Sequence, residues 1–389
     1  MFGLRLLPWE YGVRNLFRRP GRSALTLAGL TTVVFLVVVV VGFVQGLERS
    51  LAVSGDENVV LVHALGAGEN LEYSSIAAST ADLLPASLEG VRRRFDQAYV
   101  SPELYLGTQV ALAADQPRSM GLVRGVTPAV YLVRRQVQLQ TGAWPAAGEV
   151  LVGRLAAAKL GWPPEQLSVG REVLFEGRSW RVCGQFSAGG SVFESELWCP
   201  LPDLQDAMKR QDLSLVALTL APGAKLGEVQ LFCNRQLTLE LQPTRESDYY
   251  AHLARDYRLV RGLAWLIAGL VAAAGAFAGL NTMYGAVVGR VREFAMLQTL
   301  GFPRRAVALA LMQEAVLLAT AGSLLATLLA LLVADNAAVR FTMSAFALRI
   351  DGTAVLVGCG AGLLLGVLGA IPPSIRAMRM PVVDGLKAI

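Results

Sequence analysis

The chain has 389 residues, of which 54% are hydrophobic and only 17% are charged. A soluble domain typically has roughly 45–50% apolar and about 25% charged residues, so this composition argues against a purely soluble globular protein. The 35 basic and 30 acidic residues give a net charge of +5, which is too small to indicate a nucleic-acid-binding protein. The four cysteines and two histidines have no CxxC or zinc-ligand spacing, so we expect neither a metal site nor thiol redox chemistry.

Four stretches are almost free of charged residues, and each holds the ~20 residues needed to cross a hydrocarbon core about 30 Å thick. We expect transmembrane helices at 23–47, within the stalk and span 259–289, at 306–334 and at 352–375. A cleavable signal peptide is disfavoured by the long segment that precedes the first stretch, and no soluble domain here could enclose such helices. The sequence therefore predicts an α-helical membrane protein with four transmembrane helices plus an inserted α+β extracytoplasmic domain.

Basic residues are distributed unevenly around the predicted spans, and this indicates orientation because cationic loops are poorly translocated. The basic segments expected in the cytoplasm are 1–22, 290–305 and 376–389, and the segments expected outside are 48–258 and 335–351. Both termini are therefore expected in the cytoplasm. Arg255, Arg258 and Arg261 do not fit this assignment, but long translocated domains obey the rule weakly.

The external segment 48–258 has ordinary composition and alternates strand-like with helical patterns. Strands are predicted at 59–62, 149–152, 180–186, 196–201 and 215–220, and helices at 80–95, 154–160 and 204–210. The order of elements within 107–150 stays open. At the end of the segment, Tyr250, Leu253 and Tyr257 repeat at helical spacing with no Gly or Pro in 246–261. This pattern predicts one continuous helix that enters the second span.

The cytoplasmic segment 290–305 reads as a short amphipathic helix with a sharp end. Phe294, Leu297 and Leu300 fall on one face, and Gly301 followed by Pro303 supplies a helix stop. Such a helix is expected to lie at the membrane interface. A plain loop between two spans is the alternative, but a loop needs neither an apolar stripe nor so sharp an end.

The run R-x-R-E-F-x-M-L-x-x-L-G-x-P in this segment resembles the coupling segment of the MacB/FtsX/LolC-type permeases of ABC transporters. Residues 9–30, the strands near 148–201 and the tail 372–381 are similar to the same family. The resemblance implies a dimeric permease with a MacB-like periplasmic domain, which works by mechanotransmission in the bacterial inner membrane. It also assigns ATPase coupling to Arg290, Arg292, Glu293, Phe294, Met296, Leu297 and Gly301.

The chain has no G-x-x-x-x-G-K-[ST] motif to hold nucleotide phosphates. We therefore expect a non-catalytic subunit of the split type, without a cofactor of its own, whose cytoplasmic ATPase partner binds ATP. His63, Glu194 and Glu196 are catalytic candidates by residue type only, and we interpret them as solvated groups.

The sequence also allows predictions for Glu314 and for the cysteines. Glu314 is the only charged residue in the third span, and we expect it to snorkel or to form an interhelical hydrogen bond rather than to relay protons. If a disulfide forms in the external domain, Cys183 with Cys199 is the predicted pair, while Cys359 is expected to pack as a small apolar residue.

Two functions remain open at the level of sequence. The first is export or extraction of a hydrophobic or amphiphilic substrate, such as a lipoprotein, lipid, peptide or antibiotic. The second is an FtsX-like mechanical transmitter that activates an extracytoplasmic partner such as a cell-wall hydrolase. A membrane-anchored enzyme is disfavoured, because an anchor needs neither three closing spans nor an amphipathic cytoplasmic helix. Expected partners are a second copy or paralogue, membrane lipid and an optional periplasmic adaptor or outer-membrane protein, but no nucleic acid.

Overall fold

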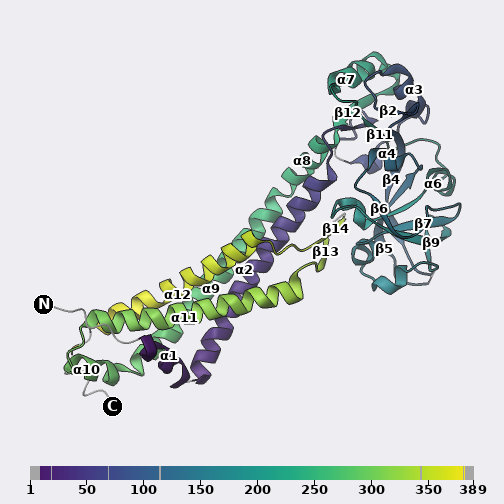
Figure 1. The fold of residues 1–389 in the computed structure, drawn as a ribbon. Coiled ribbons are helices and arrows are strands. Elements are labelled where there is room, and N and C mark those ends of the chain that lie inside the picture. The colour runs from purple at the N-terminus through teal and green to yellow at the C-terminus, as the bar shows by residue number, and fades with distance from the viewer. Residues whose placement is uncertain are drawn as a thin grey trace. The chain divides into compact units, whose positions relative to one another are not determined.

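The computed structural model describes residues 9–18, 20–68, 70–113, 115–341, 344–379 and 381. The chain divides into two compact units (Figure 1). The membrane unit comprises Met1–Gln45, Leu259–Ala337 and Leu348–Ile389, and the extramembrane unit comprises Gly46–Arg258 and Ala338–Ala347. Residues 1–8 of the predicted N-terminal segment and 382–389 of the predicted tail lie outside the described residues.

The membrane unit is built from helices. They are α1 (Trp9–Arg18), α2 (Pro20–Ser54), α9 (Arg258–Val288), α10 (Val291–Thr299), α11 (Arg304–Leu329) with its π-helical extension η5 (Ala330–Ala334), and α12 (Gly352–Arg379). Among the described residues, α2, α9, α11 with η5, and α12 are long and apolar enough to cross a membrane, with mean hydropathies between 2.1 and 2.8. The four spans predicted from the sequence fall on these four helices.

Glycines on α12 allow three helices of this unit to pack closely. A Cβ atom added at Gly362 would lie 2.2 Å from Ser323 Oγ of α11, and one at Gly358 would lie 2.2 Å from Val38 Cγ2 of α2. Only glycine fits such contacts, which dispersion forces stabilise in a bilayer. The helix α9 differs, because just 6% of its most apolar window is buried, against 33–39% for the other three.

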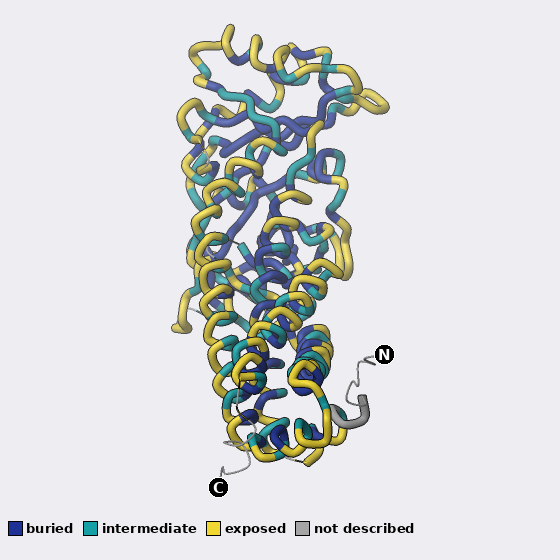
Figure 2. Tube along the Cα trace, turned by 90° about the vertical axis from the view of Figure 1, so that its left-hand side faces the viewer, coloured by how far each residue is buried: buried dark blue, intermediate teal, exposed yellow. Residues whose placement is uncertain are grey.

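The extramembrane unit contains a ten-stranded sheet with the order β12-β1-β11-β4-β5-β10-β7-β9-β6, and β8 pairs with β9. The strands are β1 (Val59–Ala64), β4 (Val100–Val110), β5 (Ser119–Val126), β6 (Gln138–Gly142), β7 (Glu149–Gly153), β8 (Glu172–Phe175), β9 (Arg178–Ser187), β10 (Glu196–Pro200), β11 (Leu215–Thr219) and β12 (Leu241–Arg245). The pairs β5–β10 and β7–β9 are parallel and the others are antiparallel. Figure 2 shows these strands mainly as buried, whereas the long helices carry extended exposed faces.

Helices and short strands surround this sheet. The helical elements are η1 (Leu71–Tyr73), α3 (Thr80–Ser87), α4 (Val130–Val133), α5 (Ala156–Leu160), η2 (Pro164–Leu167), η3 (Val192–Ser195), α6 (Leu201–Met208), α7 (Leu226–Arg235), η4 (Leu237–Leu239) and α8 (Glu246–Asp256). Two small hairpins pair β2 (Arg93–Arg94) with β3 (Gln97–Ala98), and β13 (Ala338–Phe341) with β14 (Ser344–Ala347). The predicted fold class, four membrane helices with an inserted α+β domain, is confirmed.

Most predicted elements of this unit are present, with one error of extent. A strand occupies each of the five predicted positions, and α5 and α6 match two predicted helices. The helix predicted at 80–95 is wrong beyond Ser87, because Leu88 is extended and Val91 bridges to Leu220 of the sheet. The undecided segment 107–150 contains the end of β4, then β5, α4 and β6.

The predicted continuous stalk helix is interrupted at Tyr257. The helix α8 ends at Asp256 and α9 begins at Arg258, with Tyr257 between them at φ −76° and ψ 3°. The Tyr257 ring packs edge-on against Phe341 of β13 at a centroid distance of 5.1 Å. This tertiary contact accompanies the break, which a helical repeat in the sequence could not reveal.

Cys183 and Cys199, the pair expected if a disulfide forms in the external domain, are free thiols in the structure. Cys183 lies on β9 and Cys199 on β10, and β7 runs between these strands. One intervening strand separates the two backbones by about 9.5 Å, whereas disulfide-bonded Cα atoms lie about 4.4–6.8 Å apart.

Candidate functional site

The apolar face of α10 packs into the membrane unit. Phe294 is 3% exposed and contacts a cluster formed by Val287 of α9, Val307 and Leu311 of α11, and Ala377 of α12. Leu297 packs against the same cluster. The helix ends at Thr299, and Gly301 takes φ +89° before Pro303 caps α11. The amphipathic helix expected here is therefore present, and its apolar residues contact three neighbouring helices.

The opposite face of α10 is open. Arg292 is exposed, and so is Met296, with 45% of its surface accessible. Leu300 was expected beside Phe294 and Leu297, but it is 70% exposed, because the chain leaves the helix at that point. Glu293 is half-buried, and its Oε2 atom accepts no hydrogen bond from the described residues. This face therefore presents a thioether and a guanidinium, while the Glu293 carboxylate lies at its edge with Oε2 buried.

Glu314 forms an interhelical polar cluster, as expected, and not a solitary charge in the span. Its Oε2 accepts hydrogen bonds from Arg290 Nη1 at 2.8 Å and from Asn15 Nδ2 at 3.0 Å, while its Oε1 accepts one from Arg290 Nη2 at 3.3 Å. All three residues are buried. We call them the Asn15–Arg290–Glu314 cluster, and it connects α1, the start of α10 and α11.

The sequence placed Arg290 among the residues for ATPase coupling, and the structure buries it at 4% exposure. Asn15 was not predicted as a site residue. The available signal was a single amide between Arg14 and Leu16 in an amphipathic helix. Its partner lies 299 positions away along the chain, so local pattern alone could not identify the contact.

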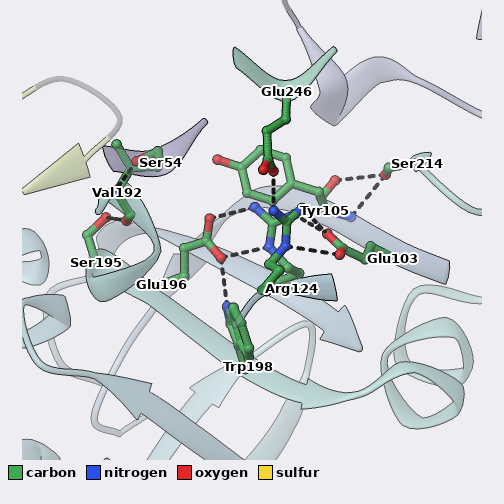
Figure 3. A network of polar contacts seen from close by, with 11 residues as sticks. Ser54, Glu103, Tyr105, Arg124, Val192, Ser195, Glu196, Trp198, Ser214 and Glu246 are labelled. Carbon is green, nitrogen blue, oxygen red and sulfur yellow. Dashed lines mark hydrogen bonds and ion pairs between the residues drawn. The ribbon is translucent and has the colours of Figure 1, made fainter. Parts of the chain in front are cut away.

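A second polar cluster lies inside the extramembrane unit (Figure 3). Arg124 of β5 donates to both oxygens of Glu196 of β10, at 2.7 and 2.6 Å, and to Glu103 of β4 at 2.5 Å. Arg134, which follows α4, donates twice to Glu103, at 3.1 Å each, and once to Glu246 of α8. We call these five residues the buried charge network.

The network places three carboxylates against two guanidiniums, all at most 4% exposed. Burial raises the pKa of Glu246, and Arg134 offsets only part of this effect. Burial also acts to raise the pKa of Glu103, but Arg134 and Arg124 together bring it below its ordinary value. Glu246 therefore holds a negative charge less readily than Glu103 does.

Glu194 and Glu196 were interpreted as solvated groups, and this is wrong, since both are 1% exposed. Glu194 accepts hydrogen bonds from the backbone N–H groups of Ala188 and Gly190 and from Arg154 at 2.7 Å. His63 is also buried, and burial lowers its pKa. These contacts satisfy the polar groups and explain why they can lie inside the fold.

Two family models match the chain. The model of the MacB-like periplasmic core domain matches residues 23–230, just over half of the chain. The model of the FtsX-like permease C-terminal region matches residues 265–382. The chain belongs to the MacB/FtsX-type family of ABC transporter permeases. This confirms the resemblance found in the sequence, and it places α10 and Glu314 within the FtsX-like part of the permease.

Comparison with solved structures gives distant similarities. The periplasmic region of MacB from Actinobacillus actinomycetemcomitans matches with 12% identity and a TM-score of 0.39, covering 52% of this permease and 94% of that chain. The extracellular domain of the noncanonic ABC-type transporter YknZ from Gram-positive bacteria matches with 15% identity and a TM-score of 0.36, covering 48% and 100%. Comparison with curated proteins gives no match.

Membership of this family indicates the type of subunit, its ATPase partner and its location. ABC permeases of this family are generally non-catalytic subunits that act with a cytoplasmic ATPase. The four apolar helices and the family together indicate a multi-pass protein of the inner membrane, and the family implies dimerisation.

Proposed function

We propose that this permease couples ATP hydrolysis by a separate cytoplasmic ATPase subunit to export or extraction of a hydrophobic or amphiphilic substrate at the outer face of the inner membrane. The observation that carries the proposal is the two-sided α10. Its exposed face offers Arg292 and Met296 to a partner, with the half-buried Glu293 at its edge, while Phe294 is buried against three membrane helices. A force applied to the exposed face is therefore delivered to the membrane unit.

The Asn15–Arg290–Glu314 cluster strengthens this coupling. The guanidinium of Arg290 binds the Glu314 carboxylate through two nitrogens, a geometry that fixes orientation as well as distance. Since Asn15 donates to the same carboxylate, displacement of α10 also acts on α1 and α11. The coupling residues in this proposal are thus Arg292, Glu293, Met296 and, from the buried side, Arg290.

An apolar groove supports a hydrophobic or amphiphilic cargo. A cavity of about 570 Å³ lies between α2 and α9, and its lining includes Leu25, Leu30, Val33, Val271 and Ala278. Cavities that hold small molecules usually measure about 300–1,000 Å³, with mostly apolar walls. Lipoprotein acyl chains, lipids, apolar peptides and amphiphilic antibiotics all carry a segment that suits this groove.

A second copy or a paralogue completes the proposed complex. Large apolar side chains of α9 are exposed in the single chain, among them Leu263, Trp265 and Phe277 at 50%, 47% and 73%. Membrane lipid and a partner permease both suit such a surface. We also propose that both termini lie in the cytoplasm and that the extramembrane unit lies on the outer side of the membrane. A periplasmic adaptor or an outer-membrane protein is an optional further partner.

Mechanical activation of an extracytoplasmic partner, such as a cell-wall hydrolase, is the alternative. The observation that favours it is the continuity of α2, one unbroken helix from Pro20 in the membrane unit to Ser54 in the extramembrane unit. A continuous helix can transmit a displacement along its axis without the passage of any solute.

The test is purification of the tagged chain from its native host in mild detergent, with mass spectrometry of all co-purifying molecules. An ATPase with a lipid, lipoprotein or adaptor supports transport and identifies the cargo class. An ATPase with a peptidoglycan hydrolase supports mechanical activation instead. Recovery of the chain without any ATPase, under conditions that preserve its dimer, would overturn both.

A further inference from the structure

In the extramembrane unit, the end of α2 and the start of α8 cross at very short range. A Cβ atom added at Gly55, the residue after α2, would lie 2.7 Å from Ser247 Cα and 3.1 Å from the Glu246 carbonyl oxygen. Real Cβ atoms do not approach backbone atoms so closely, so this position requires glycine. The two segments that lead toward membrane helices therefore meet at one point, which we call the helix crossing.

One carboxylate bridges the helix crossing. Glu246 Oε2 accepts the backbone N–H of Asp56, just beyond α2, at 3.2 Å, while Glu246 Oε1 accepts a hydrogen bond from Arg134. Glu246 is itself the first residue of α8 and is 1% exposed. Its two oxygens thus connect three separate segments of the chain.

The bridge continues into the sheet. Arg134 binds Glu103 on β4, and Glu103 shares Arg124 of β5 with Glu196 of β10. Figure 3 shows Glu246 at one side of this chain of contacts and Trp198, which donates to Glu196 at 2.7 Å, at the other. The position of the helix crossing is therefore specified by buried, charge-assisted hydrogen bonds to three strands.

The close packing is confined to the helix crossing, because a cavity of about 50 Å³ lies beside the start of α8. Its lining includes Arg124, Arg134, Glu246, Tyr249 and Tyr250. Its walls also include apolar side chains such as Leu51, Leu61 and Leu215. The helix could shift into this space if the polar contacts were lost.

We propose that Glu246 is a positioning residue that locks the end of α2 and the start of α8 to the sheet of the extramembrane unit. Only the role of this lock in transmitting ATP-driven movement rests on the proposed function. The lock itself can be measured in the full-length chain without any ATPase.

The test is hydrogen–deuterium exchange of the full-length protein in detergent, comparing wild type with Glu246→Gln. The amide keeps one oxygen and replaces the other with an NH₂ group that cannot accept, so either the Asp56 N–H or Arg134 then faces a donor instead of an acceptor. We expect peptides covering residues 51–57 and 246–250 to exchange about tenfold faster, the factor expected for about 1.4 kcal/mol. Asp248→Asn is the matched control, because Asp248 lies in the same turn of α8 but is exposed, and we expect no change.

A second variant and a functional measurement distinguish loss of the lock from misfolding of the protein. Gly55→Ala should separate the same two segments while every charge is kept, and it should give the same exchange pattern. In the complex with its ATPase, Glu246→Gln should retain ATP hydrolysis. Vanadate, which traps the ATPase, should then no longer change hydrogen–deuterium exchange in the extramembrane unit of this variant. Faster exchange in 246–250 alone, or equal effects from Asp248→Asn, would overturn the lock. Failure to recover an ATPase would instead count against the proposed function and leave the exchange result valid.

Discussion

Arg290 and Glu314, which are 24 positions apart, form a buried ion pair with two hydrogen bonds of 2.8 and 3.3 Å. The arginine precedes α10 and the glutamate lies on α11, so the pair holds the start of α10 against α11. Burying either charge without the other would cost several kcal/mol, roughly, because the region has a low dielectric constant. Removal of one partner is therefore expected to be more destabilising than replacement of both.

The first prediction concerns this pair. Glu314→Ala should destabilise the full-length protein by about 3–5 kcal/mol, because it leaves the Arg290 charge buried and unpaired. The double variant Arg290→Met with Glu314→Leu should recover most of that loss, since two apolar side chains replace the pair. Unfolding in mild detergent, followed by tryptophan fluorescence, measures both. A double variant less stable than Glu314→Ala would contradict the proposed burial of the pair.

The second prediction separates the two faces of α10. Phe294→Ala should cost about 3–5 kcal/mol of stability, because it removes a buried aromatic ring. Met296→Ala should change stability by less than about 0.5 kcal/mol, as exposed substitutions usually do. Together with Glu293→Ala, however, it should reduce ATPase recovery or uncouple hydrolysis from output. Co-purification and ATP turnover measure this, and unchanged assembly and turnover would count against α10 as the coupling surface.

The third prediction is a pH dependence set by Glu246 and Glu103. Burial raises the pKa of Glu246 above 4.5, so the folded state binds more protons there than the unfolded state, and this contribution to stability falls as pH rises through the raised pKa. Glu103 behaves oppositely: although burial opposes it, the two arginines lower its pKa, so its contribution is present above 4.5 and falls as pH drops through the lowered value.

The combined contribution of these two carboxyl groups to the stability of the extramembrane unit should therefore be greatest at mildly acidic pH. Glu246→Gln should flatten the decline on the neutral side and leave the acid side unchanged. Thermal unfolding of the full-length protein between pH 3 and about pH 8, the range in which carboxyl groups with shifted pKa values titrate, measures this. The same slope in wild type and Glu246→Gln would show that Glu246 does not hold the extra proton.

The fourth prediction tests the apolar groove. Ala278→Trp places a large ring in the cavity between α2 and α9, so it should reduce substrate-stimulated ATP hydrolysis while basal hydrolysis continues. Leu324→Trp on α11 is the matched control, because Leu324 is 64% exposed and does not line the cavity. Lipid and cargo retained by each purified variant can be compared by mass spectrometry. Equal retention by both variants would remove the groove from the proposed transport path.

The sequence by itself determined the membrane architecture. Four long apolar segments have few alternatives, because a backbone in lipid must satisfy its hydrogen bonds within a helix. The α10 segment was also predictable, since an apolar stripe with Gly301 and Pro303 encodes a helix and its end in a few neighbouring residues. Strands such as β1 and β11 could be found because β-branched residues cluster locally along them.

Only the tertiary structure decided which polar groups are buried and which partners they have. Glu196 looks like a solvated charge in the sequence, yet it pairs with Arg124, 72 positions away. Asn15 meets Glu314, and Glu246 meets Asp56, across still larger separations. The break at Tyr257 accompanies an aromatic contact with β13. Such pairings depend on the register and order of the sheet and on the packing of helices, which no local pattern of residues specifies.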